Sequence, residues 1–401
     1  MLKLEKIDEI KKLLVQKTEL YESNENKRRL EIWGPGFIPD IYSPGQIVPY
    51  PAEKRIEKKI PIVMDWDRRQ WSQFFGFNIS EFYKDPVEYL RWTLKIDIYR
   101  FSNFDDDTPI LKTIPITLGC PYEASLFGVK VIYSDLHEPL FKSDGAVVKT
   151  EKDLSRLKIP NFKKDGLMPL AYKFFEKINK IIPEDFEVIF PKWGRGPIGM
   201  AFALAGMEDL LIKLIDEPKF VHKLMRIITD SRIEYTKFRR SLINKADTEN
   251  ALMNDEATIP IISKDQYEEF GFPYENEIAI FNNGIGWWHA CGNKTPLIPI
   301  IKKIKNVKVI DINWWTDDIK PAISMLNGEI PFIIRPSARD ITEKNECIIS
   351  NYIDSIINVC GNENYAIRLD AFQPTNASDD DAEKVKRFLK VFKNKEIRSE
   401  N

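Results

Sequence analysis

Histidine and cysteine are scarce in this chain of 401 residues, which has three histidines and four cysteines. The cysteines, Cys120, Cys291, Cys347 and Cys360, are scattered, so the sequence implies no disulfide framework. Long hydrophobic runs are also missing: the longest apolar stretch, around residues 197–207, is well short of the roughly 20 residues that a membrane-spanning helix needs. No N-terminal signal segment is visible. We therefore expect a cytoplasmic, reducing compartment.

An excess of charge of one sign is missing as well. Lysine and arginine total 59 against 61 for aspartate and glutamate, a formal net charge of −2. This balance gives no electrostatic case for nucleic acid as a partner. Hydrophobic residues make up 43% and charged residues 30%, typical of a globular protein with a full-sized core. The length suits one large α/β domain or two ordinary ones.

The chain divides at about residue 60. Leu4, Ile7, Ile10 and Leu14 have helical spacing, so residues 1–24 are predicted to form a helix. Residues 32–54 are rich in proline and glycine and predict an irregular segment wrapped over the surface. We therefore predict a helical arm and wrapping segment over 1–59, followed by one catalytic domain over 60–401.

Short apolar strands alternate with helices in the second part, which indicates a parallel sheet with right-handed crossovers. The strand count comes close to the eight of a (β/α)₈ TIM barrel, which is the predicted fold. A doubly wound open sheet is the alternative, but no glycine-rich dinucleotide motif follows a first strand. The region from 114 to 141 predicts a β-hairpin excursion, and one helix is predicted over 198–215. Strands are predicted over 60–64, 96–101, 186–190, 251–253, 277–281, 307–312, 332–334 and 365–369.

The most informative stretch runs from 282 to 296 and contains His289 and Cys291. A predicted strand precedes it, and Thr295 with Pro296 is typical of a helix start. Residues i and i+2 of an extended chain share a face, so both side chains are expected to point the same way. An imidazole and a thiolate side by side are two of the ligands that zinc prefers.

Further polar residues come directly after predicted strands, where the loops of a barrel carry the chemistry. Asp255 and Glu256 lie between a strand and a capped helix, and different environments would separate their pKa values; with His289 they are the candidate catalytic residues. Arginine side chains at the ends of strands can bind anionic groups of a substrate, and tryptophan side chains can pack against a flat substrate. The candidate substrate-binding residues are Arg68, Trp193, Arg195, Trp287, Asn313 and Arg335.

Several segments, taken in order, resemble the uroporphyrinogen decarboxylase superfamily, and the likeness covers roughly residue 60 to the C-terminus. The similarity is greatest to its branch of corrinoid-linked, zinc-dependent methyltransferases. A TIM barrel is the fold that the resemblance implies. The segments begin at Gly196 (Gly-Pro-Ile-Gly-Met), Met207 (Met-Glu-Asp-Leu-Leu), Asp216 (Asp-Glu-Pro), Asn254 (Asn-Asp-Glu-Ala) and His289 (His-Ala-Cys-Gly-Asn).

The resemblance also implies a metal site and its chemistry. In that branch two thiolates and an imidazole hold zinc, which activates a substrate thiol. His289 and Cys291 match, but after the last predicted strand the chain reads Asp370-Ala-Phe-Gln-Pro, with no cysteine. Either Asp370 or Glu256 supplies an oxygen ligand, or Cys360 lies closer than the strand order suggests, or no metal binds and His289 acts as a general acid or base.

Three functions remain open. The first is methyl transfer between a corrinoid, free or carried by a partner protein, and a thiol or related small molecule. The second is a metal-free carboxy-lyase of the uroporphyrinogen decarboxylase type, although the arginine-rich N-terminal motif of true decarboxylases has only a loose analogue in Asp65-Trp-Asp-Arg-Arg. The third is a non-catalytic corrinoid or tetrapyrrole binder.

Overall fold

The protein is a TIM barrel of parallel strands. The computed structural model describes residues 2–33, 38–39, 47–48, 59–142, 145–243, 251–343, 345–370 and 379–399. Two of its strands, β4 (Thr113–Pro115) and β7 (Glu187–Ile189), form a parallel pair. The other six form one parallel sheet in the spatial order β3 (Ile62–Asp65), β12 (Tyr365–Asp370), β11 (Phe332–Arg335), β10 (Ile310–Asn313), β9 (Trp287–His289), β8 (Ala251–Met253).

Backbone hydrogen bonds join β8 to the segment that follows β7. Gly196 N–H donates to the carbonyl oxygen of Met253 at 2.8 Å, and Met253 N–H donates to that of Gly194 at 2.9 Å. These bonds make a parallel bridge between Arg195 and Met253. The barrel wall is therefore continuous on this side although β7 itself ends at Ile189.

Carboxylates complete the wall between β3 and β4. Asp107 accepts a hydrogen bond from Ile62 N–H at 3.0 Å, and Asp106 accepts one from Met64 N–H at 2.9 Å. Asp107 N–H in turn donates to the carbonyl oxygen of Ile62 at 2.8 Å. A strand edge must satisfy its peptide groups, and here two buried aspartates do so in place of a neighbouring strand.

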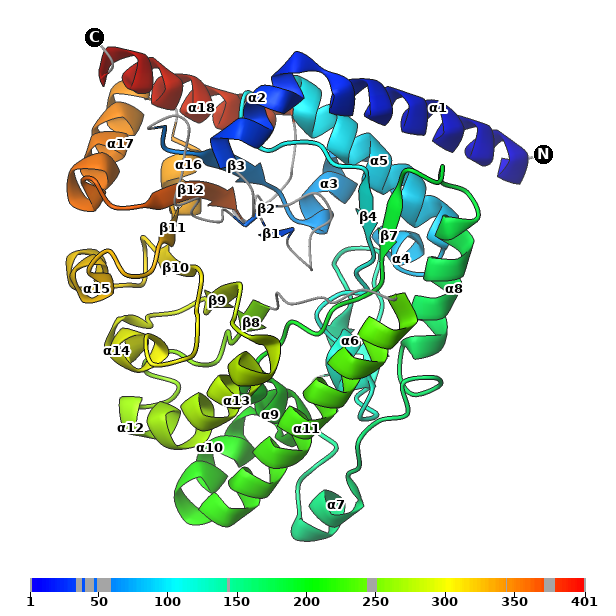
Figure 1. Cartoon of the computed structure of the whole chain (residues 1–401), viewed down its shortest axis with the longest axis vertical. Coiled ribbons are helices and arrows are strands. Elements are labelled where there is room, and N and C mark those ends of the chain that lie inside the picture. The colour runs from blue at the N-terminus through cyan, green and yellow to red at the C-terminus, as the bar shows by residue number, and fades with distance from the viewer. Residues whose placement is uncertain are drawn as a thin grey trace.

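Helices cover the outside of the strands (Figure 1). The first and last elements of the barrel meet, since β3 pairs with β12. The helices after the arm are α3 (Arg68–Phe75), α4 (Ile79–Phe82), α5 (Pro86–Asn103), α6 (Tyr122–Ser125), α7 (Glu151–Arg156), α8 (Met168–Asn179), α9 (Pro197–Ala205), α10 (Met207–Asp216), α11 (Pro218–Ile243), α12 (Lys264–Gln266), the π-helix η1 (Tyr267–Gly271), α13 (Phe272–Asn282), the 3₁₀-helix η2 (Thr295–Leu297), α14 (Ile298–Ile301), α15 (Ile319–Leu326), α16 (Ala338–Ile341), α17 (Glu346–Cys360) and α18 (Asp379–Ser399).

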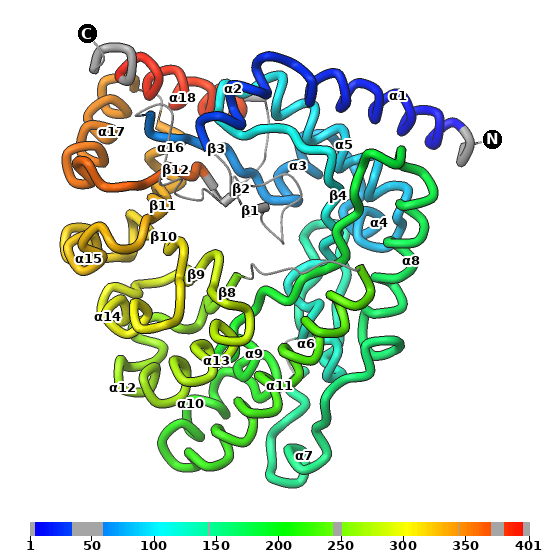
Figure 2. The backbone as a smooth tube through the Cα atoms, in the orientation of Figure 1, coloured from blue at the N-terminus to red at the C-terminus, as the bar shows by residue number. Residues whose placement is uncertain are grey.

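Two helices form the N-terminal arm, α1 (Leu2–Glu22) and α2 (Asn24–Trp33). Helix α1 lies along α5 (Figure 2), where Lys17 and Asp97 form a buried ion pair at 2.6 Å. Trp33 of α2 packs on Val63 and Ala366 of the barrel, and its indole N–H donates to the carbonyl oxygen of Asp107 at 2.7 Å. The wrapping segment predicted over 32–54 lies largely outside the described residues, apart from the antiparallel pair β1 (Ile38–Pro39) and β2 (Ile47–Val48).

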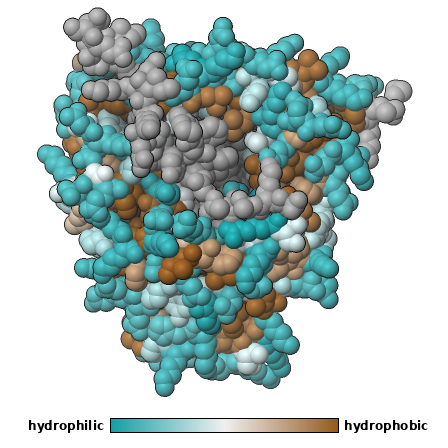
Figure 3. All heavy atoms as spheres, viewed as in Figure 1, coloured by the Kyte–Doolittle hydropathy of each residue, from teal (hydrophilic) through white to brown (hydrophobic). Residues whose placement is uncertain are grey.

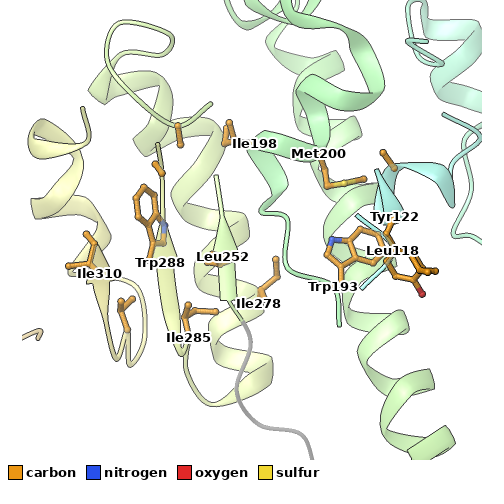
Figure 4. Close-up of a cluster of buried hydrophobic side chains, with 14 of the residues drawn as sticks. Leu118, Tyr122, Trp193, Ile198, Met200, Leu252, Ile278, Ile285, Trp288 and Ile310 are labelled. Carbon is orange, nitrogen blue, oxygen red and sulfur yellow. The ribbon is translucent and has the colours of Figure 1, made fainter. Parts of the chain in front are cut away.

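Side chains alternate along each strand between the helix layer and the barrel interior. Outward-facing residues such as Leu252, Trp288 and Ile310 belong to the large hydrophobic core under the helices (Figure 4). The inward-facing residues form two layers. The apolar layer contains Val63, Ala251, Trp287, Val309, Ile333 and Ala366. The charged layer lies two residues further along the same segments and contains Asp65, His289, Asp311, Arg335 and Arg368.

The predicted hairpin excursion is present as β5 (Val131–Ile132) paired antiparallel with β6 (Leu140–Phe141). Among the described residues no helix combines the length and apolarity needed to cross a bilayer. The face seen in Figure 3 is mainly hydrophilic, with hydrophobic residues scattered among polar ones.

Three predicted elements are wrong. Residues 96–101 continue α5, and residues 277–281 belong to α13, because a short apolar run does not distinguish a strand from a buried helix. The strand of the central motif begins later, at Trp287, after Asn283 has ended α13 in the left-handed conformation with φ of 60°. The single helix predicted over 198–215 is two helices, separated at Gly206 with φ of 88°.

Candidate functional site

Three side chains converge where β8 and β9 end. His289 is the last residue of β9, Cys291 lies two residues beyond it, and Asp255 lies two residues beyond β8. His289 Nε2 lies 3.3 Å from Cys291 Sγ and 3.2 Å from Asp255 Oδ1, and the Cys291 thiol donates to Asp255 Oδ1 at 3.0 Å. These potential ligand atoms all lie within 4.8 Å of one another. We call Asp255, His289 and Cys291 the triad.

The triad lies between solvent and the barrel interior. His289 is buried, Asp255 is partly buried and Cys291 is exposed. The thiol is therefore open to an incoming molecule, whereas the imidazole is held by the protein. This gradient of exposure is suited to a site in which a small molecule reaches the exposed side and meets fixed groups behind it.

Asp311 holds the imidazole from the interior. Its Oδ2 lies 2.6 Å from His289 Nδ1 and accepts a hydrogen bond from Arg335 Nη1 at 3.0 Å. A proton on Nδ1 bonded to this carboxylate leaves Nε2 facing Asp255 and Cys291, the arrangement usual for histidines that bind metals. Asp311 is fully buried, so its contact with His289 is shielded from solvent.

The charges of this group shift each other's pKa values. Burial lowers the pKa of His289, but the carboxylate of Asp311 and the Cys291 sulfur raise it, and the net pKa is well above the usual value. Burial raises the pKa of Asp255, but the hydrogen bond and charge of His289 bring it well below the usual value. The imidazole thus lies between two carboxylates, which favour its protonated form.

A second ion pair lies next to the triad. Arg195 Nη1 donates to Glu256 Oε1 at 3.1 Å, and the guanidinium stacks on Phe141 of the hairpin at 5.3 Å. Burial raises the pKa of Glu256, while Arg195 opposes that rise. The carboxylate that the structure places beside His289 and Cys291 is Asp255, whereas Glu256, an expected alternative third ligand, is paired with Arg195.

Two other residues were expected as possible third ligands, Asp370 and Cys360. Asp370 is the last residue of β12, in register with Asp65, and its side chain lies outside the described part of the structure. Cys360 is buried at the end of α17, before β12 begins, and burial raises the pKa of its thiol to about 12. Cys360 is not a member of the triad.

The predicted tryptophans are both buried. The Trp193 indole N–H donates to the carbonyl oxygen of Arg195 at 3.1 Å, so this side chain supports the loop that carries the arginine. Trp287 lies in the apolar layer, its ring 4.9 Å from the His289 ring and 5.2 Å from the Arg368 guanidinium. Trp287 therefore forms part of the surroundings of the imidazole.

Asn313 and Arg68 contact protein groups. The Asn313 amide donates to the carbonyl oxygens of Ala290 at 2.8 Å and Cys291 at 3.0 Å, which fixes the backbone of the loop that follows β9. Arg68 begins α3 and is buried, and its backbone N–H donates to Glu138 Oε1 at 2.9 Å. Asn313 thus supports the loop after β9, and Arg68 joins the start of α3 to the hairpin of β5 and β6.

Comparison with known proteins identifies the family. The family model of uroporphyrinogen decarboxylase (URO-D) matches residues 112–357, which is more than half of the chain. The chain belongs to the uroporphyrinogen decarboxylase family. A search of curated proteins gives no match. Among solved structures, a methyltransferase from Methanosarcina mazei is similar with a TM-score of 0.63 and 14% sequence identity, over 84% of this chain and 94% of that one. At this identity the likeness shows the fold.

The triad of this family member fits a zinc ion by the chemistry of its donors. Imidazole nitrogen, thiolate sulfur and carboxylate oxygen are the three ligand types that zinc takes in proteins, and three protein ligands leave a position for substrate. The carboxylate behind His289 supplies the outer hydrogen bond that metal-bound histidines have. Asp255 thus offers a third potential ligand from the loop after β8, whereas the resemblance led us to expect the third ligand after the last strand.

Asp311 was not among the predicted site residues, and a signal for it exists in the sequence. The strand reads Ile310-Asp-Ile-Asn313, and the alternation places Asp311 and Asn313 on one face opposite the apolar residues. A carboxylate on the inner face of a barrel strand points into the interior.

Proposed function

We propose that the chain is a methyltransferase whose reaction centre is the triad, with zinc held by His289 Nε2, Cys291 Sγ and an oxygen of Asp255. The observation that carries the proposal is the convergence of these three atoms within 4.8 Å at the carboxyl ends of β8 and β9. Active sites of TIM barrels lie at that end. The bound metal would lower the pKa of an incoming thiol and so supply a nucleophilic thiolate.

The protein supplies orientation around this centre. Asp311 holds the tautomer of His289, and Asn313 holds the backbone carbonyls at 290 and 291. Lys294 and Asp317 form a fully buried ion pair at 2.6 Å, and Asp317 also accepts from the backbone N–H of Asn313 at 2.8 Å. These contacts connect the loops after β9 and β10. The loop that carries the exposed Cys291 thiol is therefore fixed by hydrogen bonds.

We further propose that the methyl group is exchanged with a corrinoid, free or carried by a partner protein, and that a small-molecule thiol is the other reactant. In the direction of thiol methylation, the thiolate sulfur forms a bond to the methyl carbon, the cobalt–carbon bond breaks, and its electron pair stays on cobalt as Co(I). The thiol proton is released to solvent or a neighbouring base. The support is the His-x-Cys pair on a URO-D barrel together with the methyltransferase among similar folds.

Elemental analysis and one spectral assay test the proposal. The purified protein is expected to hold about one zinc per chain, and Cys291→Ser and Asp255→Ala are expected to lose it. Methylcobalamin with a small thiol should be converted to the Co(I) form by the wild type and not by Cys291→Ser. Cys347→Ser is the matched control, since Cys347 is exposed on α17. A protein without zinc that leaves methylcobalamin unchanged would contradict the proposal.

A metal-free carboxy-lyase is the second candidate, favoured by the arginines of the charged layer. Arg335 and Arg368 are buried in the interior beside His289 and Trp287, where guanidinium groups can bind substrate carboxylates. Release of carbon dioxide from a polycarboxylate by chelator-treated protein, retained in Cys291→Ser, would favour this reaction over methyl transfer.

A further inference from the structure

A buried carboxylate behind the barrel wall connects the two strands that carry the triad. Glu275 of α13 is fully buried and accepts three hydrogen bonds. The donors are Asn254 Nδ2 at 3.0 Å, the Tyr267 hydroxyl at 2.6 Å and the Trp288 indole N–H at 2.8 Å. Trp288 is in the hydrophobic cluster of Figure 4, close to α13. The carboxylate is thus fixed from three directions.

Two of these donors are direct sequence neighbours of the triad. Asn254 precedes Asp255, and Trp288 precedes His289. Asn254 N–H also donates to the carbonyl oxygen of His289 at 2.8 Å, so the two segments are joined by a backbone bond as well. We propose that Glu275 is a positioning residue that sets the distance between Asp255 and His289, and thereby the geometry of the metal centre; this rests on the proposed function.

Close packing leaves Asn254 little freedom to move. A Cβ atom added to Gly196 would lie 1.8 Å from Asn254 Oδ1, so the backbone of the neighbouring segment already touches this side chain. Asn254 is fully buried. Its amide is therefore held between Gly196 on one side and the Glu275 carboxylate on the other.

The π-helix η1 brings the third donor to the carboxylate. Tyr267 begins η1, and a Cβ atom added to Gly271 at its end would lie 2.6 Å from the Tyr267 ring. Glycine at 271 thus lets the ring pack into the wide turn. Single π-turns within helices occur often at functional sites, and here the turn aims a hydroxyl at Glu275.

The proposal requires a carboxylate at 275 and not merely a polar side chain. Three donors face its two oxygens, so an amide in its place would direct its own NH₂ group at one of the donors. Burial raises the pKa of Glu275, and the donors Tyr267, Trp288 and Asn254 oppose that rise. Glu275→Gln is therefore the sharpest substitution, since it preserves size and replaces one acceptor oxygen by an uncharged NH₂ donor.

The test measures zinc affinity by competition with a chromophoric chelator. Glu275→Gln is expected to weaken zinc binding about 10- to 100-fold, the usual effect of losing a residue that orients metal ligands. Tyr267→Phe removes one donor, is expected to have a smaller effect in the same direction, and serves if Glu275→Gln does not fold. Glu277→Gln is the matched control, because Glu277 lies on the same helix in a half-exposed pair with Arg226 and should leave zinc affinity unchanged.

A second readout does not depend on metal. Alkylation of Cys291 by iodoacetamide is followed by mass spectrometry in chelator-treated protein, with the exposed Cys347 as internal reference. Movement of Asp255 releases the hydrogen bond that holds the thiol proton, so Cys291 in Glu275→Gln is expected to react about three- to tenfold faster, with Cys347 unchanged.

The outcomes separate the two proposals. A wild type that binds no zinc contradicts the metal centre, and the Cys291 rate alone then decides whether Glu275 positions the triad. If Glu275→Gln lowers the melting temperature while zinc affinity and the Cys291 rate equal those of the wild type, Glu275 is a structural residue and the positioning role is overturned.

Discussion

The apolar and charged layers of the barrel interior occupy the same strands, two residues apart, yet they have opposite chemistry. Two residues after Trp287 comes His289, and two residues after Ile333 comes Arg335, whereas on β8 Ala251 is followed by the apolar Met253. Burial of the apolar layer stabilises the folded protein by about 25 cal/mol for each Å² of apolar surface removed from water. Burial of the charged layer costs desolvation free energy, which is offset only where each charge has a partner of opposite sign.

This difference indicates where stability and activity reside. The charged layer lies at the end of the strands from which barrel enzymes act, and two of its members, Asp311 and Arg335, contact His289. Proteins depart from the most stable choice of residue mainly at functional sites. The comparison predicts that a substitution beside His289 in the charged layer will weaken zinc binding, whereas a substitution in the apolar layer will lower stability alone.

The largest effect on stability is expected from breaking the ion pair of Arg368 with Asp65. Both side chains are buried and hydrogen-bonded to each other. Arg368→Met leaves the Asp65 carboxylate in the interior without its cation and should lower the free energy of unfolding by about 3–5 kcal/mol, measured by urea denaturation. Arg368→Met combined with Asp65→Leu should recover most of the loss. A single substitution that costs no more than the double one would show that the pair is not mutually dependent.

The second prediction concerns Asp311, which orients His289 from the charged layer. Asp311→Asn keeps the size of the side chain but removes the charge that holds the Nδ1 proton. Zinc affinity is expected to fall about 10- to 100-fold, measured by chelator competition. Asp185→Asn, in an exposed pair with Lys112, is the control. If Asp311→Asn bound zinc with unchanged affinity, the prediction that Asp311 supports the metal site by orienting His289 would be wrong.

Local sequence patterns predicted the parts of the site that depend on one strand. His289 and Cys291 were expected side by side because i and i+2 share a face, and the structure places their side chains 3.3 Å apart. The strands at 251–253 and 332–334 were predicted from short apolar runs between turns. The run at 277–281 is also short and mainly apolar but is helical, because tertiary packing decides the structure of short apolar runs.

Contacts between side chains of different strands could not be predicted from sequence patterns. Asp255 was expected to be catalytic, but its hydrogen bonds to both His289 and Cys291 depend on β8 and β9 being neighbours in register. Asp311 acts on His289 from the strand on the other side. Glu275 reaches the site through side chains that point away from the interior. None of these relations has a fixed sequence spacing.

The apolar layer supplies the third prediction, with a smaller effect. Ile333 is fully buried and packs with Trp287 and Val309. Ile333→Val removes one methylene and should lower the free energy of unfolding by about 0.5–1.5 kcal/mol, without change in zinc affinity. Urea denaturation and chelator competition on the same preparation check both parts. A loss of zinc affinity as large as that of Asp311→Asn would show that the two layers do not act separately.

The smallest effect is expected at the surface, where an ion pair is solvated. The hydrogen bond from Arg28 lowers the pKa of Glu25 on α2 to about 2, against burial, which raises it. Because the folded pKa is below the ordinary 4.5, the contribution of Glu25 is complete above pH 4.5 and is lost as the pH falls toward 2. Glu25 is 41% exposed, so Glu25→Gln should cost less than about 1 kcal/mol at pH 7. Urea denaturation at pH 7 and pH 3 checks this, with the exposed Glu19→Gln on α1 as control. The difference in free energy of unfolding between Glu25→Gln and wild type should be smaller at pH 3 than at pH 7. A difference of several kcal/mol, or one that does not depend on pH, would mean that solvated pairs on the arm stabilise this protein as strongly as the buried pairs of the charged layer.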